Sequence, residues 1–387
     1  MPRTTDMPWR ARWNIPGIGL LCLLLLVLAA CAPNSPGAST FPKNKLSLLR
    51  VPTSYALPGQ IVRGPDGNLW FPAIAYANFA TTQPSGAVGR LTTAGQFHFF
   101  TLPDLNSYPT ALTFASDGSI WFVAFQGNGQ KAALGDTAPS FTGGFFEIGH
   151  MTPDGQFHLF RLPSSDASVK SIAAGPDGNL WFTENVNADR TSSPYIGRMT
   201  PAGVFSSFPV TVPFPYGYLD QIIAGPDGNL WFSVEEGDAS YNALGAIGTI
   251  TPQGAISLVQ LGKFTVPLDM AVGPDHNIWF TTFYEVGRVT PEGQVHLFNP
   301  DPKASQNNRV ILGGIASGPD GNLWFATENV AVGRITTAGA ATFYAFPDNT
   351  YFDEGSSSLT LGQLKGIVTG ADGALWLTDG GQIGHFV

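Results

Sequence analysis

The sequence contains little cysteine, and this scarcity excludes several kinds of site. Only two of its 387 residues are Cys, at Cys22 and Cys31, and both lie near the N-terminus. The rest of the chain therefore cannot form an internal disulfide, a cysteine metal site or a cysteine nucleophile. Its stability must come from side-chain packing and from strand pairing.

Charged residues are also scarce, at 12% of the sequence, about half the share found in soluble domains. The 19 basic residues are outnumbered by 28 acidic ones, which gives a net charge of −9. The basic residues are scattered along the chain rather than clustered. This balance argues against nucleic acid as a partner.

The first 30 residues differ from the remainder. Three Arg residues precede an apolar run over 15–30, which is shorter than the roughly 20 residues that a membrane span needs. We interpret residues 1–30 as a secretory signal. Its end, Leu-Ala-Ala-Cys, resembles the bacterial lipobox, which implies cleavage before Cys31 and lipid attachment to its thiol.

This interpretation predicts an exported protein, anchored to a bacterial membrane through lipid on Cys31 only. Residues 31–44 are rich in Pro, Ser, Ala and Gly and are expected to form a tether. Removing the signal with its three Arg and one Asp would change the net charge from −9 to −11. We expect the mature domain, outside the cytoplasm, to be a monomer.

One short phrase organises residues 45–387. Gly-Pro-Asp-Gly-Asn-Leu-Trp-Phe, at residues 64–71, recurs in full or with substitutions at intervals of 45 to 60 residues. The seven copies are centred on Trp70, Trp121, Trp181, Trp231, Trp279, Trp324 and Trp376. A period of this length is typical of a repeat architecture.

A second phrase, Ile-Gly-Arg-x-Thr-Pro-x-Gly in its fullest form, follows each copy. In the third unit we predict strands over 171–174, 180–184, 196–200 and 204–209, separated by turn residues. Four antiparallel strands repeated seven times predict an all-β, seven-bladed β-propeller. The repeated Trp residues are expected to fill the gaps between neighbouring blades.

The ends of the repeat predict how the ring closes. The last unit has no fourth strand, whereas residues 45–52 resemble the fourth strand of an earlier unit, 158–163. An N-terminal strand that completes the last blade would remove the sheet edges of an open ring.

The connections between second and third strands predict where ligands bind. From each Trp to the next phrase's Gly the spacings are 19, 28, 16, 17, 8, 9 and 8 residues, so blades one to four carry long loops on one face. Function on a rigid scaffold tends to lie on such loops. We expect a small-molecule or protein ligand at a rim of aromatic residues there: Tyr76, Phe125, Phe146, Tyr195, Tyr216, Tyr218, Tyr241 and Tyr284. The alternative is that these rings only hold the long loops on the propeller.

Together the two phrases resemble the repeat of the virginiamycin B lyase (streptogramin lyase) family over residues 45–387. The resemblance implies a seven-bladed propeller and a carbon–oxygen lyase that opens a cyclic ester by elimination. It also implies a Mg²⁺ ion, metal-holding Glu residues, and a general-base His two positions before the leading apolar residue of a blade's first strand.

This sequence departs from that pattern. In chain order the seven positions hold Gly59, Thr110, Lys170, Asp220, Leu268, Gly313 and Lys365. A general base near neutral pH is best served by a group such as His, so the departure argues against the lyase activity. If a base remains, the candidates are Lys170, Asp220 and Asp269.

Acidic residues follow several of the repeated Trp residues. Glu184, Glu235, Glu328 and Asp379 lie at the ends of second strands, three or four positions after their Trp. If these carboxylates converge, they could hold Mg²⁺ or Ca²⁺. If they do not, they form a solvated rim.

Two functions therefore stay open. The first is a lipid-anchored binding propeller that recognises a ligand on its long-loop face. The alternative is a magnesium-dependent lyase of the streptogramin lyase type.

Overall fold

The computed structural model describes residues 46–52, 55–56, 60–75, 86–104, 106–127, 134–135, 138–139, 144–152, 154–186, 194–214, 217–236, 244–302, 311–327, 331–346, 366–379 and 381–387. The predicted signal, Cys31 and the tether lie outside these residues. No helix that could cross a membrane is found in the part of the chain that the structure describes.

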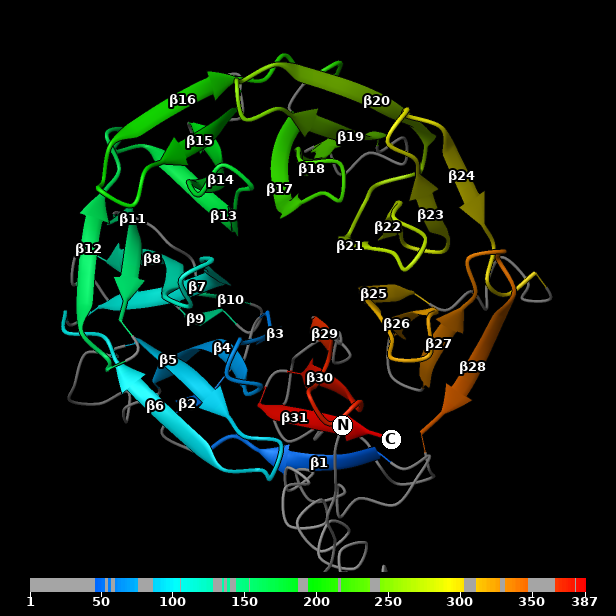
Figure 1. Cartoon of the computed structure of the whole chain (residues 1–387), viewed down its shortest axis with the longest axis horizontal. Coiled ribbons are helices and arrows are strands. Elements are labelled where there is room, and N and C mark those ends of the chain that lie inside the picture. The colour runs from blue at the N-terminus through cyan, green and yellow to red at the C-terminus, as the bar shows by residue number, and fades with distance from the viewer. Residues whose placement is uncertain are drawn as a thin grey trace, which may run out of the picture. The chain divides into compact units, whose positions relative to one another are not determined.

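Seven β-sheets surround a central axis (Figure 1), which confirms the predicted all-β seven-bladed propeller. Blade one holds β2 (Tyr55–Ala56), β3 (Val62–Arg63), β4 (Leu69–Ala75), β5 (Gly86–Leu91) and β6 (Phe97–Thr101). Blade two holds β7 (Ser107–Phe114), β8 (Ile120–Gly127), β11 (Gly144–Met151) and β12 (Phe157–Arg161). Blade three holds β13 (Ala167–Ala174), β14 (Leu180–Val186), β15 (Tyr195–Met199) and β16 (Phe205–Pro209).

The other half of the ring continues the same order. Blade four holds β17 (Gly217–Ala224), β18 (Leu230–Glu236), β19 (Leu244–Ile250) and β20 (Ile256–Lys263). Blade five holds β21 (Asp269–Val272), β22 (Ile278–Thr281), β23 (Val286–Val289) and β24 (Val295–Phe298). Blade six holds β25 (Leu312–Ser317), β26 (Leu323–Thr327), β27 (Ala331–Ile335) and β28 (Ala341–Ala345). Blade seven holds β29 (Gly366–Thr369), β30 (Leu375–Asp379), β31 (Gln382–Phe386) and β1 (Leu46–Arg50).

The N-terminal strand lies in the same sheet as the C-terminal one. β1 pairs antiparallel with β31, with Leu46 opposite Phe386 and Arg50 opposite Gln382. Figure 1 shows β1 as the outermost strand of this blade. The backbone groups of β31 are thus paired on both sides, by β30 and by β1.

The repeated Trp residues are buried between blades. All seven are at most 9% exposed, and Trp181 packs against Leu219 and Ile222 of the next blade. The turn that precedes each second strand holds the indole in place: in blade four Asp227 Oδ1 accepts hydrogen bonds from Asn229 N at 3.2 Å and Trp231 Nε1 at 3.0 Å. The Asp of the repeated phrase therefore fixes both its turn and its Trp.

The repeated Gly of the third strands leaves room for an aromatic ring. Gly287 of β23 lies opposite Phe280 of β22, and a Cβ on Gly287 would collide with the Phe280 ring. Five other blades repeat this pairing of Gly with Phe. The Gly thus allows the ring to cross the middle of its own sheet.

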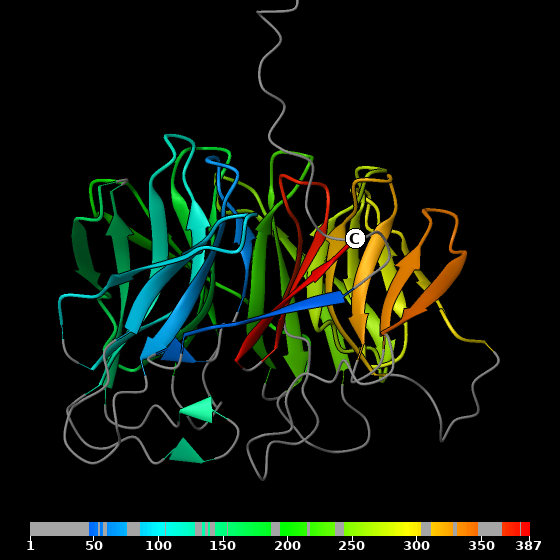
Figure 2. The same ribbon diagram turned by 90° about the horizontal axis from the view of Figure 1, so that it is seen from below.

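The two ends of the blades differ (Figure 2). Short hairpin turns gather at one end, and the small hairpin of β9 (Leu134–Gly135) and β10 (Ala138–Pro139) lies at the other. Most residues of the predicted long loops, including Tyr76 and Tyr241, lie outside the described residues. The described part of the molecule that positions a site is therefore the inner wall of the ring.

Candidate functional site

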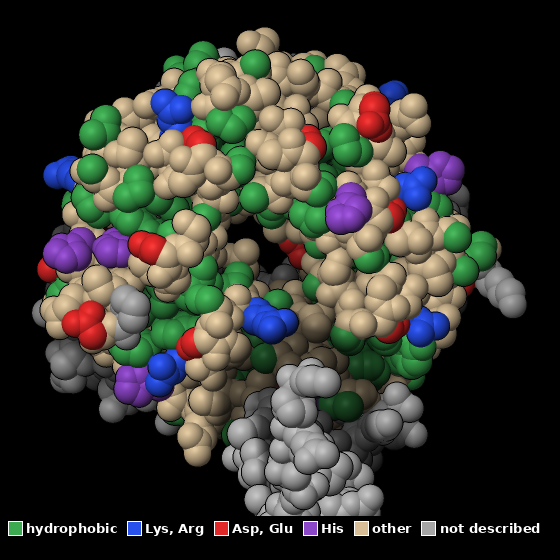
Figure 3. All heavy atoms as spheres, viewed as in Figure 1, with side chains coloured by type: hydrophobic (Ala, Val, Ile, Leu, Met, Phe, Trp, Pro, Cys, Tyr) green, Lys and Arg blue, Asp and Glu red, His purple; other side chains and the backbone are tan. Residues whose placement is uncertain are grey.

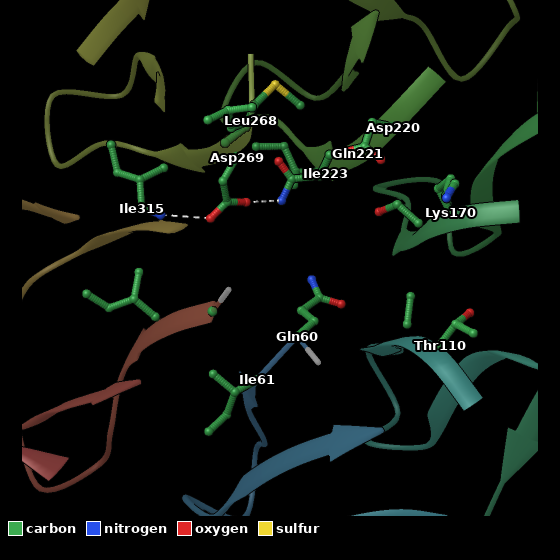
Figure 4. A pocket seen from close by; sticks show the side chains of 15 residues that line it. Gln60, Ile61, Thr110, Lys170, Asp220, Gln221, Ile223, Leu268, Asp269 and Ile315 are labelled. Carbon is green, nitrogen blue, oxygen red and sulfur yellow. Dashed lines mark hydrogen bonds between the residues drawn. The ribbon is translucent and has the colours of Figure 1, made fainter. Parts of the chain in front are cut away.

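A cavity lies on the axis of the ring. Its volume is about 280 Å³, and residues from all seven blades line it. Figure 3 shows the hollow at the centre of the ring, and Figure 4 shows the lining side chains. The polar ones are Gln60, Thr110, Lys170, Ser171, Asp220, Gln221 and Asp269, and the apolar ones are Ile61, Ala111, Ile223, Leu268, Met270, Ile315 and Ile367.

Bulges in the innermost strands present several of these residues. The pairing of β13 with β14 shifts register between Val169 and Ile172, and that of β17 with β18 shifts between Leu219 and Ile222. A bulge leaves residues out of the ladder and re-aims their side chains. Lys170 and Asp220 lie in these two bulges and point into the cavity (Figure 4).

Side-chain hydroxyls support these bulges. Ser171 N donates to Thr183 Oγ1 at 3.1 Å, and Gln221 N donates to Ser233 Oγ at 2.9 Å. Thr183 Oγ1 also donates to the Asp220 carbonyl at 3.2 Å, which connects blade three to blade four. Backbone groups that the bulges remove from the ladder therefore still have partners.

Asp269 connects three blades. Its Oδ1 accepts from Gln221 Nε2 of blade four at 2.6 Å, and its Oδ2 accepts from Ile315 N of blade six at 2.7 Å (Figure 4). Burial raises the pKa of Asp269 to about 7, against the opposing effect of these hydrogen bonds. The carboxyl therefore exchanges its proton near neutral pH while it holds the inner strands together.

Asp220 and Glu235 form an acidic pair in blade four. Burial raises the pKa of Asp220, and the charge of Lys170 opposes the rise. Burial and the nearby Asp220 raise the pKa of Glu235 to about 7, although the hydroxyl of Tyr218 donates to Glu235 Oε2 at 2.5 Å. The charges of Glu235, Asp220 and Lys170 thus influence one another. Of the three, Lys170 and Asp220 line the cavity.

The predicted metal residues do not converge where they are described. Glu184 is 5% exposed and accepts a hydrogen bond from Ser207 Oγ of the outer strand β16 at 3.4 Å, whereas Glu235 lies next to Tyr218 of the innermost strand β17. Glu328 and the side chain of Asp379 lie outside the described residues. No three His, Cys, Asp or Glu side chains that could hold a metal ion come together among the described residues. These residues do not fit a Mg²⁺ ion, and we derive no step from one.

The predicted aromatic rim divides into two groups. Phe125 and Phe146 are at most 9% exposed and meet edge to face at a centroid distance of 5.1 Å. Tyr195 and Tyr218 are half-buried, and Tyr284, at 42% exposed, lies next to Phe283. The Phe pair packs the propeller, and the described Tyr side chains remain accessible. Tyr76, Tyr216 and Tyr241 lie outside the described residues.

The general-base position of the family pattern does map onto the cavity. Five of its seven positions are among the described residues, and four of these line the channel: Thr110, Lys170, Asp220 and Leu268. Gly59 and Lys365 lie outside the described residues. All six histidines of the chain are among the described residues, on outer or third strands and in one turn. None of them lines the cavity.

Sequence reasoning missed part of this site. It did not single out Gln221, whose amide holds Asp269, nor the apolar half of the wall with Ile61 and Ile315. Gln221 could have been found from its place directly after Asp220, because the two residues lie together in the bulge of β17 and both line the cavity. The repeated phrase gives no indication that Ile61 and Ile315 face the cavity.

Comparison with known proteins adds the following. Residues 141–313 and 240–386 match the model of the Virginiamycin B lyase family. A virginiamycin B lyase from Nocardia farcinica (strain IFM 10152) is 28% identical over 124 residues, which are 32% of this chain and 34% of that protein. The matched segment thus spans about a third of that relative.

Solved structures resemble the whole propeller. One is a catalytically inactive histidine-to-alanine variant of virginiamycin B lyase from Staphylococcus aureus with quinupristin, at 24% identity and a TM-score of 0.63, covering 88% of this chain and 98% of that one. Another is YCF48 bound to D1 peptide, at 14% identity and a TM-score of 0.57, covering 90% and 96%. At these identities the likeness shows the fold.

Proposed function

Because the chain belongs to the virginiamycin B lyase family, we propose that it is a ligand-binding member, which takes a small molecule in its central channel and does not open cyclic esters. We further propose that it works outside the cytoplasm, anchored through lipid on Cys31. The fold alone does not decide between these activities: of its structural relatives, one is a lyase and another is bound to a peptide.

One observation carries the first proposal. The channel positions at which the family pattern places a general-base His hold Thr110, Lys170, Asp220 and Leu268, and no His of the chain lines the cavity. A ring-opening elimination needs a base within hydrogen-bond reach of the proton it removes. A walled cavity with a few convergent polar groups is what a small-molecule site requires.

The test is incubation of the full-length chain with a streptogramin B antibiotic and Mg²⁺. Ring opening would be followed by liquid chromatography, with and without a chelator. We expect no turnover above a protein-free control. Chelator-sensitive ring opening would overturn the proposal.

The anchor has its own test. Expressed in a bacterium, the full chain should label with a radioactive fatty acid and fractionate with membranes, and Cys31→Ser should lose the label. Cys22→Ser is the matched control, because Cys22 lies within the predicted signal. Equal labelling of wild type and Cys31→Ser would contradict lipid attachment at Cys31.

A lyase remains the second candidate because of one feature. Asp269 and Glu235 have pKa values raised to about 7 by burial, which suits a carboxyl to general-base work near neutral pH. In this case Lys170, Asp220 or Asp269 would act as the general base in place of His. The antibiotic assay, repeated with Asp220→Asn and Asp269→Asn, separates this candidate from simple binding.

A further inference from the structure

We propose that the channel ligand is a small zwitterion with an aliphatic side chain, of the α-amino-acid class. Its ammonium group would lie against Asp220, its carboxylate against Lys170, and its side chain against the isoleucines of the opposite wall. This inference rests on the proposed binding function and names the ligand's chemistry.

The two charged residues that would bind such a ligand, Lys170 and Asp220, lie on neighbouring strands and do not form an ion pair with each other. Lys170 and Asp220 occupy equivalent bulges of neighbouring innermost strands, and both line the cavity. Their charges interact, yet they are not among the ion pairs formed by the described residues. A ligand that carries both signs of charge could satisfy both groups at once.

Asp220 has unused capacity to accept hydrogen bonds. Within the described part of the chain, its carbonyl accepts from Thr183 Oγ1, while no hydrogen bond reaches its carboxylate. Asp269 differs, because its two oxygens already accept from Gln221 and Ile315. The Asp220 side chain is half-buried, and an ammonium group with three donors would supply the hydrogen bonds that its carboxylate does not receive from the described residues.

Three isoleucines line the other side of the cavity, where Gln60 is the polar neighbour of Ile61. Ile61 of blade one, Ile315 of blade six and Ile367 of blade seven line it, together with Gly366, which adds no side chain. Figure 4 shows Ile61 and Ile315 across the channel from Lys170 and Asp220. An aliphatic group that contacts these isoleucines would be removed from water, which favours binding. The positions of Lys170 and Asp220 on one side and of the isoleucines on the other favour one orientation of a ligand with a charged and an aliphatic end.

The size of the cavity limits the ligand. At about 280 Å³, it lies at the lower bound of pockets that take drug-sized molecules. A single amino acid is therefore a better match than a folded peptide. A ligand with only an ammonium group would offer Lys170 no counter-ion, and one with only a carboxylate would lie beside the carboxylate of Asp220.

Three probes of matched shape test the proposal by titration calorimetry with the full chain. They are L-leucine, 3-methylbutylamine (leucine without its carboxylate) and 4-methylpentanoate (leucine without its ammonium). We expect leucine to bind at least tenfold more tightly than either analogue. No leucine binding, or equal or tighter binding of one analogue, would overturn the zwitterion.

Two variants assign the charges. Lys170→Met should weaken leucine to the level of 3-methylbutylamine, and Asp220→Asn should weaken it to the level of 4-methylpentanoate. Lys263→Met, at an exposed residue of the outermost strand β20, and Glu292→Gln, at an exposed residue of the turn between β23 and β24, are controls that should bind like the wild type. Thermal unfolding of each variant checks that it folds.

The outcomes separate this inference from the proposed function. Tight binding of an analogue alone would refute the zwitterion and leave a channel that binds small molecules. Ring opening of a streptogramin would refute the proposed function whatever the three probes do.

Discussion

His385 Nε2 lies 3.0 Å from Asp372 Oδ2 in blade seven, in the strand that pairs with the N-terminal strand. The His385 side chain is completely buried, and its ring meets Trp376 edge to face at 4.4 Å. In four other blades an Arg occupies this position and lies over the Trp, as Arg198 does over Trp181. Blade seven thus has a buried His, where the two ends of the chain meet, in place of a half-buried Arg.

Loss of this contact should destabilise the closed ring. We expect His385→Ala to lower the free energy of unfolding by about 1 to 3 kcal/mol, because Asp372 loses a buried hydrogen-bond partner. His296→Ala, at an exposed position of blade five, should change it by less than about 0.5 kcal/mol. Urea unfolding measures both, and equal effects would refute the role of His385.

The pH dependence of the same contact has a definite sign. Burial alone would raise the pKa of Asp372, but hydrogen bonds from His385, Ala374 N and Trp376 lower it below its ordinary value. The stabilisation by ionised Asp372 is therefore present above the pKa of the unfolded chain and is lost as pH falls through the folded value. Asp372→Asn should flatten the loss of stability below about pH 4. An unchanged acid transition would contradict this.

The ionisation of Asp269 should change stability with pH in the direction opposite to that of Asp372. Its pKa is raised from 3.8 to about 7 in the folded protein, so unfolding releases a proton between these values, and stability falls as pH rises from about 4 to about 7. Glu235 contributes with the same sign. Melting temperatures between pH 5 and pH 8 measure the slope, and Asp269→Asn should reduce it.

Two substitutions of Asp269 separate the effect of its charge on stability from the effect of its hydrogen bonds. Asn at 269 can still accept from Ile315 N. Gln221 Oε1, which has no partner among the described residues, can accept from the new amide. Asp269→Leu removes both bonds and should cost about 1 to 3 kcal/mol more than Asp269→Asn. Equal unfolding free energies would show that the hydrogen bonds of Asp269 do not join the blades.

The close approach of Gly287 to Phe280 predicts sensitivity to a single methyl group. Gly287→Ala should destabilise by about 1 to 3 kcal/mol, because the ring must move. Gly262→Ala is the matched control, because a Cβ there meets nothing within 4 Å. Chemical denaturation of the two variants tests this, and equal losses would contradict the packing argument.

Deletion of residues 41–52 should lower the melting temperature markedly. It removes β1, leaves β31 with an unpaired edge, and uncovers Phe386 and His385. Deletion of residues 32–40 is the control and should leave the transition unchanged. Circular dichroism melts compare the two, and an unaltered transition in the first would show that the ring does not depend on its N-terminal strand.

The fold could be predicted from the sequence because each repeat contains the residues that specify the strands and turns of one blade. In blade three the predicted strand 180–184 is observed as Leu180–Val186, and 204–209 as Phe205–Pro209. Turn chemistry and the buried Trp recur in every unit, so each copy supports the others. The Gly under each Phe escaped notice because it acts through an absent side chain.

The candidate site was predicted only in part. Lys170, Asp220 and Asp269 were singled out and all line the cavity. Glu184 and Glu235 were grouped because they follow their Trp residues at similar spacings, but Glu184 bonds to Ser207 of an outer strand and Glu235 to Tyr218 of an innermost strand. Glu184 follows its Trp by three positions and Glu235 by four, and a difference of one residue turns a strand's side chain to the opposite face. The two carboxylates therefore point to different faces of their blades, although their spacings look alike.

The pairing of β1 with β31 also sets an order of events in time. Leu46 and its partner Phe386 are 340 positions apart, so the first strand to be synthesised must wait for almost the whole chain before its partner exists. Contacts of such separation form slowly. Until then β31 lacks its outer partner, and the faces of blades one and seven that pack together in the closed ring are uncovered. The vulnerable period for aggregation is therefore the interval before the two ends meet, and a chaperone that shields Leu46–Arg50 during that interval would speed recovery of closed rings.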